Sequence, residues 1–319
     1  MSDKCASNIR QVDATALAEA VALLRAGELV ALPTETVYGL AARADSESAV
    51  AKIYHAKGRP DFNPLIVHVA SLEAAENIAQ FDDRARALAA AFWPGALTLV
   101  LPLKEGAGIA PAVTAGLPTI ALRCPAHPVM RTVLAELGAP LAAPSANRSG
   151  GVSPSTAAHV AASLGAAVQL ILDGGAAAQG IESTIIAIRV SGRTAGWSML
   201  RPGPVTSQQV TEIVGEESDV TASNGVVEAP GQLASHYAPG KPVRLGALTA
   251  QADEFHIGFG SVAGAVTLSA SGDLAEAASR LYTCLHLAAA AKQTRVAIAP
   301  VPHEGIGVAI NDRLTRAAA

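Results

Sequence analysis

The strongest constraint on the fold is a regular alternation of helical and strand patterns along the first 210 residues or so. The segments 15–27 and 46–58 both have a helical pattern, and each ends at a glycine, Gly27 and Gly58. Short apolar runs predict strands at 29–35, 64–69, 97–103, 119–123, 140–144, 168–175 and 183–188. This alternation predicts an α/β domain. Because several connections are too short for crossover helices, we expect a mixed sheet rather than an all-parallel one.

The chain changes character between residues 215 and 240, where small, polar and turn-forming residues predict a linker. Beyond it, apolar runs and a long amphipathic helix starting at Asp273 predict a second, smaller α/β unit. We therefore predict a first domain at residues 1–210, a linker at 211–240 and a second domain at 241–319. A turn-rich linker between two rigid units suggests a lid over a site.

Composition and charge argue against a protein that binds nucleic acid directly. Half of the residues are hydrophobic and 16% are charged, as in a well-packed globular protein. The formal net charge is −4, no block of like charges occurs, and aromatic residues make up 3% of the chain. The chain therefore lacks both the basic stripe and the stacking surface of such proteins, and we expect no stable nucleic-acid binding.

The cysteines and the N-terminal residues predict a cytoplasmic location. Cys5, Cys124 and Cys284 are far apart and form no zinc-binding pattern, which favours a reducing compartment. The N-terminal segment has no apolar core of signal-peptide length. An uncharged span at 87–103 is interrupted by Pro94 and Pro102, so we expect no membrane segment.

The common nucleotide and hydrolase motifs do not account for a function. The chain contains no G-x-x-x-x-G-K-[ST] loop, no H-E-x-x-H and no G-x-S-x-G. The segment "GFGSVA" at 258–263 fits a dinucleotide fingerprint, but a strand pattern follows it where a helix is required. We interpret this segment as a turn.

Polar residues gather instead at the strand ends and in the turns that follow. They occur in "PTETVYG", "AKGRPDFNP", "PSANRSGGVSPS", "ESTI" and "LRPGP", and Arg123 ends the strand "TIALR". In open α/β sheets, ligands bind where such turns meet outside the strand ends. The pattern predicts a small-molecule site.

Each of these residues also has a simpler interpretation. Lys57 could be a cation at a helix C-terminus, and Ser145 and Asn147 could be ordinary turn residues. Arg201 could belong to a surface salt bridge, and His68 could be a core histidine. Taken alone, none of these motifs decides between the two interpretations.

Taken in order, however, the motifs closely resemble the YrdC-like family of threonylcarbamoyl-AMP synthases, in the form with a second domain. The matching stretches are "PTETVYGLAA", "IYHAKGRPDFNPLIVHV", "WPGALTLVL", "TIALRCPAHP", "PLAAPSANRSGGVSP", "GIESTII", "LRPGPV", "HYAPGKPV" and "GIGVAINDRL". They cover nearly the whole chain. The resemblance implies a YrdC-like mixed twisted sheet with helices, followed by a small Rossmann-like α/β domain.

The resemblance implies an enzyme that makes threonylcarbamoyl-AMP and pyrophosphate from ATP, bicarbonate and L-threonine. Such an enzyme is a nucleotidyltransferase of class 2.7.7, and its product feeds the modification of an adenosine in tRNA. The implied cofactor is Mg²⁺ bound with ATP, with no metal ligand from a protein side chain. The implied downstream partner is the machinery that transfers the threonylcarbamoyl group to tRNA.

The resemblance also assigns roles residue by residue. The catalytic group would be Lys57, Arg59, Ser145 and Asn147. The ATP site would contain Arg59, Asn63, Thr119, Ser145, Ser153, Arg201, His236 and Tyr237. The L-threonine site would contain Thr36, His68, Arg123, the backbone at Ala143, and Ser183. The general base for the threonine amine stays open between His68 and bound ATP.

Two other functions fit part of the sequence. One is an RNA-binding module of the same fold, against which the missing basic stripe counts. The other is an enzyme that transfers a carbamoyl group from carbamoyl phosphate to a different acceptor. The match along the whole chain favours the threonine enzyme over both.

Overall fold

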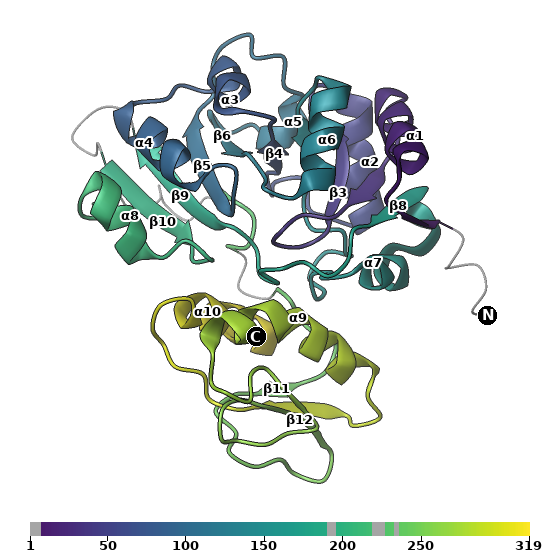
Figure 1. The fold of residues 1–319 in the computed structure, drawn as a ribbon, viewed down its shortest axis with the longest axis vertical. Coiled ribbons are helices and arrows are strands. Elements are labelled where there is room, and N and C mark those ends of the chain that lie inside the picture. Colours follow the sequence, from purple (N-terminus) through teal and green to yellow (C-terminus); the bar gives the residue numbers. More distant parts are fainter. Residues whose placement is uncertain (1–7, 190–195, 219–226, 233–235) are drawn as a thin grey trace.

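The structure is a computed structural model that describes residues 8–189, 196–218, 227–232 and 236–319 (Figure 1). Cys5 and parts of the predicted linker, residues 219–226 and 233–235, lie outside the described residues. Two units are visible in Figure 1, each with its own sheet. In the described ranges, no helix has the length and apolar character needed to span a membrane.

The larger unit contains a ten-stranded sheet in the order β1-β8-β2-β3-β7-β4-β6-β5-β9-β10. The strands are β1 (Ile9–Gln11), β2 (Val30–Leu32), β3 (Gly39–Arg43), β4 (Ile66–His68), β5 (Leu97–Pro102), β6 (Thr119–Arg123), β7 (Leu141–Ala142), β8 (Leu170–Asp173), β9 (Thr184–Arg189) and β10 (Gly196–Arg201). Parallel and antiparallel pairs both occur; β4 pairs in parallel with β6 and antiparallel with β7. The prediction of a mixed sheet is confirmed.

Helices cover this sheet (Figure 1). They are α1 (Ala14–Arg25), α2 (Glu47–Lys57), α3 (Leu72–Ile78), α4 (Asp83–Phe92), α5 (Pro111–Thr114), α6 (Pro128–Leu137), α7 (Ala157–Leu164) and α8 (Ser207–Val214), with a 3₁₀ turn η1 (Gly165–Ala167). The Ser46 side chain caps the start of α2, and Gly58 ends it in the left-handed conformation at φ 59°. The two helices predicted at 15–27 and 46–58 are confirmed.

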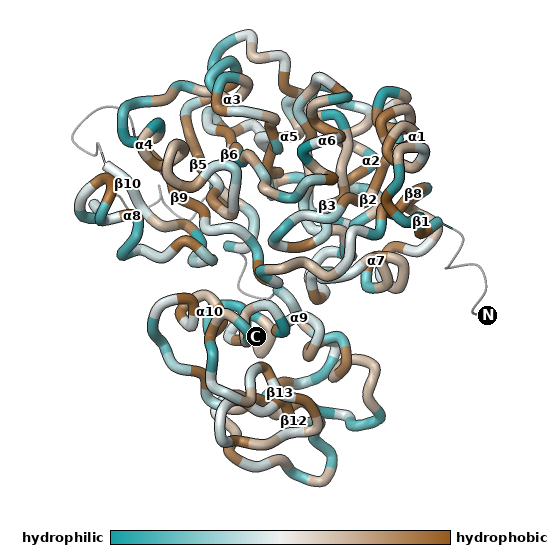
Figure 2. The backbone as a smooth tube through the Cα atoms, viewed as in Figure 1, coloured by the Kyte–Doolittle hydropathy of each residue, from teal (hydrophilic) through white to brown (hydrophobic). Residues whose placement is uncertain are grey.

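The core of the larger unit lies between the sheet and its helices. Figure 2 shows hydrophobic residues, in brown, along the strands, and two large clusters of buried apolar side chains pack there. One cluster includes Leu40, Leu99 and Ile186 from three different strands. The other joins α1 and α6 through Leu24 and Leu134. These clusters hold the strand ends in fixed positions.

The smaller unit has a parallel four-stranded sheet in the order β11-β14-β12-β13. Its elements are β11 (Val243–Arg244), β12 (Glu254–Gly258), β13 (Val266–Thr267), α9 (Leu274–Ala290), β14 (Arg295–Ile298) and α10 (Gly307–Ala318). Figure 1 shows α9 and α10 on the side that faces the larger unit. The predicted fold class, with a second α/β unit, is confirmed. The segment 258–263 forms a tight turn into β13, as interpreted from the sequence.

The two units approach each other closely. A Cβ atom added to Gly180 would lie 2.4 Å from the backbone oxygen of Ser279 in α9, so only glycine fits there. The hydroxyl groups of Ser155 and Thr283 lie 3.1 Å apart across the same boundary. Helix α8 crosses residue 210, where the sequence placed the start of the linker. The exact domain limits stay a prediction.

Candidate active site

A pocket lies above the strand ends of the larger unit, at the boundary with the smaller one. Ten of the residues predicted from the sequence line it: Thr36, Arg59, His68, Arg123, Ala143, Ser145, Ser183, Arg201, His236 and Tyr237. His68 and Arg123 are partners in the parallel register of β4 and β6. Polar residues that are distant in the chain therefore meet over the sheet edge, as ligand sites do in this class of fold.

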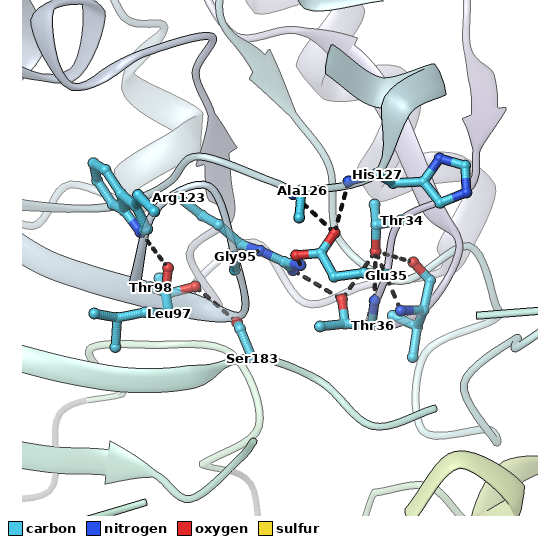
Figure 3. A network of polar contacts seen from close by, with 12 residues as sticks. Thr34, Glu35, Thr36, Gly95, Leu97, Thr98, Arg123, Ala126, His127 and Ser183 are labelled. Atoms are coloured by element: carbon cyan, nitrogen blue, oxygen red, sulfur yellow. Dashed lines mark hydrogen bonds and ion pairs between the residues drawn. The ribbon is translucent and has the colours of Figure 1, made fainter. Parts of the chain in front are cut away.

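Arg123 is held in place by three hydrogen bonds that it donates (Figure 3). Its Nη2 contacts Glu35 Oε1 at 2.5 Å, its Nη1 contacts Thr36 Oγ1 at 2.9 Å, and its Nε contacts the backbone oxygen of Gly95 at 3.1 Å. Both side chains of the ion pair are buried. The charge of Arg123 is therefore balanced inside the protein. We call Thr36, His68, Arg123 and Ser183, with Glu35 behind them, the Arg123 end of the pocket.

Glu35 is fixed from two sides. Besides Arg123, it accepts hydrogen bonds at Oε2 from the backbone N–H groups of Ala126 (3.1 Å) and His127 (3.2 Å), just before α6 (Figure 3). Burial alone would raise the pKa of the Glu35 carboxyl, but the charge and hydrogen bond of Arg123 bring the pKa below its ordinary value. Glu35 therefore stays ionised.

His68 contributes a neutral imidazole to the Arg123 end. Burial, followed by the nearby charge of Arg123, lowers the pKa of His68 to about 3. Its Nδ1 atom is buried and has no hydrogen-bond partner among the described residues. The imidazole of His68 is therefore neutral at neutral pH and is a weak base.

Ser183 connects the two parts of the pocket. Its hydroxyl lies 2.7 Å from Thr98 Oγ1. Arg201 donates to the Ser183 backbone oxygen from Nε (3.1 Å) and Nη2 (2.9 Å), and to the Ser183 hydroxyl from Nη2 (3.2 Å). Arg201 also donates to the backbone oxygen of Pro230, in the predicted linker.

Arg59 and Arg201, with Lys57 outside the pocket lining, form what we call the cation end. Within the described residues, none of these three side chains forms a salt bridge, although all are buried. Arg59 donates to Asn63 Oδ1 (2.6 Å) and to the backbone oxygens of Asn63 (3.1 Å) and Pro64 (2.8 Å). Lys57 does end α2, but it is buried there rather than exposed to solvent. The interpretation of Arg201 as a surface salt-bridge partner is wrong, because Arg201 is buried.

Burial without a carboxylate partner is reflected in the pKa values of the cation end. Burial lowers the pKa of Arg59 to about 10, and it lowers the pKa of Lys57 well below the ordinary value, with a further contribution from Arg59. Burial lowers the pKa of Arg201, and the charge of Glu182 partly offsets this decrease. The Glu182 carboxylate does not bond Arg201; it accepts hydrogen bonds from Ser153, Tyr282 and Arg313. Such a site favours an incoming anion.

Lys57 does not line the pocket directly. Its ammonium donates to the backbone oxygens of Ser145 (2.5 Å) and Asn147, which fixes the turn that follows β7. The Asn147 side-chain amide in turn donates to the backbone oxygens of Arg148 and Gly151. Lys57 and Asn147 therefore shape the loop that brings Ser145 to the pocket.

Three further predicted residues also lie outside the pocket lining. Asn63 is the partner of Arg59, and Ser153 donates its hydroxyl to Glu182 at 2.5 Å. Thr119 begins β6 and is half-buried. The structure thus brings the predicted threonine residues together, while these predicted nucleotide residues lie around rather than on the lining.

Two carboxylates at the site were missed by sequence reasoning. Glu35 supports Arg123, and Glu182 lines the pocket itself. Both belong to motifs that had been singled out, "PTETVYG" and "GIESTII". Each of these carboxylates lies next to an apolar strand, and only 16% of the residues in the chain are charged. This unusual placement is the sequence signal that could have identified them.

Comparison with known proteins places the chain in a family. The Sua5_yciO_yrdC family model, described as "Telomere recombination", matches residues 22–203. The chain belongs to the Sua5/YrdC family. A second model, described as "Threonylcarbamoyl-AMP synthase, C-terminal domain", matches residues 205–319 of this Sua5/YrdC member. The resemblance inferred from the motifs is confirmed.

Similar Sua5/YrdC proteins include a threonylcarbamoyl-AMP synthase of Bacillus subtilis, 38% identical over 100% of this chain and 96% of that protein. A threonylcarbamoyl-AMP synthase of Pyrococcus abyssi is 44% identical over 70% of this chain and 66% of its own length. The crystal structure of P. abyssi Sua5 complexed with L-threonine matches with a TM-score of 0.86 and 34% identity, covering 97% of this chain and 96% of that one.

Proposed function

We propose that this chain synthesises threonylcarbamoyl-AMP from L-threonine, bicarbonate or CO₂, and ATP, with release of pyrophosphate. This would make it a nucleotidyltransferase of class 2.7.7 whose product serves the threonylcarbamoyl modification of tRNA. The relatives named threonylcarbamoyl-AMP synthase support the proposal. The observation that carries it is the contrast in charge balance between the Arg123 end and the cation end of one pocket.

The cation end suits a nucleotide triphosphate. Buried cations whose hydrogen bonds go to neutral oxygens keep their charge available for a ligand. Arg59 and Arg201 both line the pocket, and Arg201 does so from the end of β10. A triphosphate would supply the missing negative charge, and the two guanidinium groups would stabilise charge that moves onto the leaving pyrophosphate.

The Arg123 end suits an amino acid that carries no net charge. Arg123 uses three of its five N–H donors on Gly95, Thr36 and Glu35, so two remain for a carboxylate. The Thr36 and Ser183 hydroxyl groups offer partners for a ligand hydroxyl. A site with such partners can reject an amino acid that lacks the side-chain oxygen.

The reaction needs positioning more than a covalent nucleophile. The threonine amine loses a proton and its nitrogen bonds to the carbon of CO₂, or to that of bicarbonate with release of water, to form a carbamate. A carbamate oxygen then bonds to the α-phosphorus as the bond from that phosphorus to the pyrophosphate oxygen breaks. A phosphate oxygen of ATP or His68 would accept the amine proton, and the pKa of about 3 makes His68 a weak base for this step.

Magnesium enters this proposal with the phosphates of ATP. Across the described ranges, no group of three His, Cys, Asp or Glu side chains is arranged to hold a metal ion. The two carboxylates at the pocket are engaged with arginines. A Mg²⁺ ion bound to the phosphates would add to the charge neutralisation of the cation end.

Two further parts of the proposal concern the linker and the surroundings of the enzyme. His236 and Tyr237 line the pocket from the predicted linker, which supports a role for 211–240 as a lid. Replacing Tyr237 with alanine should weaken ATP binding without unfolding the protein. The cytoplasmic location and the downstream tRNA-modifying partner stay predictions.

The test is pyrophosphate release from ATP, measured with and without L-threonine and bicarbonate. The proposal expects release only when all three are present, and L-valine in place of L-threonine should give much less because it lacks the hydroxyl. Release that does not require threonine would contradict it. Turnover with carbamoyl phosphate, or tight RNA binding at physiological salt, would favour one of the two alternative functions.

A further inference from the structure

The carboxylate of Glu182 is shared between the two units of the molecule. Glu182 lines the pocket and directly precedes Ser183. Its Oε1 accepts a hydrogen bond from Ser153 Oγ at 2.5 Å. Its Oε2 accepts hydrogen bonds from Tyr282 OH at 2.6 Å and from Arg313 Nε at 3.0 Å. Tyr282 belongs to α9 and Arg313 to α10, so the smaller unit contributes directly to the surroundings of the pocket.

This ionic contact is deeply buried. Arg313 is 0% exposed and Glu182 is 7% exposed. Despite burial, the charges of Arg313 and Arg201 lower the pKa of Glu182 to about 2. An ion pair in such a place adds little stability compared with apolar side chains of the same size. The contact between Glu182 and Arg313 is therefore better explained by the geometry that it holds than by added stability.

The same two helices also hold the end of the predicted linker. The Arg313 guanidinium carbon lies 5.5 Å from the centroid of the Tyr237 ring, and the Tyr237 ring stacks on Tyr282 with centroids 5.6 Å apart. The His236 N–H donates to the backbone oxygen of Arg316 at 3.1 Å. Two pocket-lining segments, at 182–183 and 236–237, thus depend on one side of the smaller unit.

We propose that Tyr282 and Arg313 are positioning residues for the pocket, and that they act through Glu182 and Tyr237. A shift of Glu182 would move Ser183, which is adjacent in the chain. It would also move Arg201, which donates from two nitrogens to the Ser183 backbone oxygen. The smaller unit therefore adjusts both ends of the pocket through one carboxylate. This inference rests on the proposed function, because it takes Ser183 as part of the threonine site.

The test compares three variants of the full chain with two matched controls. Tyr282→Phe removes one hydrogen bond from Glu182, and Arg313→Lys keeps the charge but loses the guanidinium geometry. Because Arg313→Met alone could unfold the protein, it is paired with Glu182→Gln in a double variant. Tyr38→Phe, which affects a buried hydroxyl bonded to Gly175 at 2.6 Å, is the control for Tyr282→Phe. Arg244→Met, which breaks a pair with Glu254 inside the smaller unit, is the control for Arg313.

Three quantities are measured: the Kd for L-threonine by calorimetry, the split between KM and kcat, and hydrogen exchange at the Thr184 amide. That amide donates to the backbone oxygen of Ala96 at 3.0 Å, next to Ser183. We expect Tyr282→Phe and Arg313→Lys to weaken threonine binding on the order of tenfold and to speed this exchange, with both controls near wild type. The double variant should fold but not regain threonine affinity.

Faster exchange with unchanged threonine affinity would reduce Tyr282 and Arg313 to structural contacts and overturn the proposal. Unchanged exchange would overturn it as well. If the wild-type protein binds L-threonine but releases no pyrophosphate, the proposed function fails, while the binding and exchange data still decide this inference. A wild-type protein that binds no threonine would overturn both.

Discussion

The two ends of the pocket hold buried arginines in opposite ways. Arg123 is paired with Glu35, and its charge is balanced before any ligand arrives. Arg59 donates to a side-chain amide oxygen and to backbone oxygens and has no carboxylate partner within the described residues, so its charge stays unbalanced. The buried cation is an arginine at both ends. The presence or absence of one carboxylate decides whether an arginine prepares a neutral or an anion-binding site.

The largest expected effect comes from removing the unbalanced charge. Arg59→Gln should lower kcat/KM by about 10³-fold, because it removes the cation that we propose stabilises the leaving phosphates. The free energy of unfolding should change by only about 1 kcal/mol, since Arg59 bonds neutral oxygens. Arg43→Gln, at an exposed pair with Asp45, is the control. Steady-state kinetics and thermal unfolding check both parts; an unchanged ATP affinity would contradict the assignment of the cation end.

The second prediction concerns a variant that removes the carboxylate partner of Arg123. Glu35→Gln leaves Arg123 buried without a carboxylate, which should lower the free energy of unfolding by roughly 3–5 kcal/mol. Threonine binding should weaken about tenfold because Arg123 loses its orientation. Inhibition by inorganic phosphate should become stronger, since the site now carries a positive charge. Calorimetric competition between phosphate and threonine measures this effect. If phosphate did not compete better in the variant, the difference in ligand preference between the two ends would not come from charge balance.

A smaller effect is expected where the two ends meet. Ser183→Ala removes a hydroxyl that contacts Thr98 and Arg201 but leaves the backbone oxygen that Arg201 uses. The KM for threonine should rise about fivefold, as for one neutral hydrogen bond, with little change in the KM for ATP. Equal effects on both substrates would show that Ser183 does not belong to one end alone.

The last prediction concerns His68 and the pH dependence of stability. The pKa of His68 is about 3 in the folded protein, against an ordinary value of 6.5, so the unfolded chain binds the proton more readily. The stability that His68 contributes is present above pH 6.5 and is lost as the pH falls toward 3. His68→Gln should flatten the fall in stability below pH 6.5 by up to about 1.4 kcal/mol per pH unit. Denaturant titrations at pH 7 and pH 5 would measure this slope, and equal slopes in both proteins would contradict a neutral buried histidine.

Much of the fold could be predicted from local pattern. The sequence itself shows the residues that begin and end helix α2, Ser46 and Gly58. The mixed sheet could be predicted because several connections are too short to contain a crossover helix. Strand β3 escaped prediction because "GLAAR" follows directly on a polar turn and has no alternating pattern of its own. Its burial depends on both neighbouring strands.

The site could be predicted as a set of residues but not as a charge arrangement. The strand-end turns identified Arg123 and Arg59, but no local pattern says that Glu35 faces a guanidinium 88 residues away. Likewise, the burial of Lys57 on the backbone oxygens of a loop about 90 residues later depends on tertiary packing. Partners at such separations are set by the topology of the sheet, which the sequence specifies only through the whole fold.

The contact between Glu182 and Arg313 has a consequence for the timing of biosynthesis. Arg313 follows Glu182 by 131 residues, so the ribosome adds the arginine long after the sheet of the larger unit has been translated. Domains fold in order as they leave the ribosome, which means that a nascent chain holds this carboxylate without its guanidinium partner. Until the smaller unit has been made and has docked, the newborn chain would thus lack the contacts of Tyr282 and Arg313 that hold Glu182.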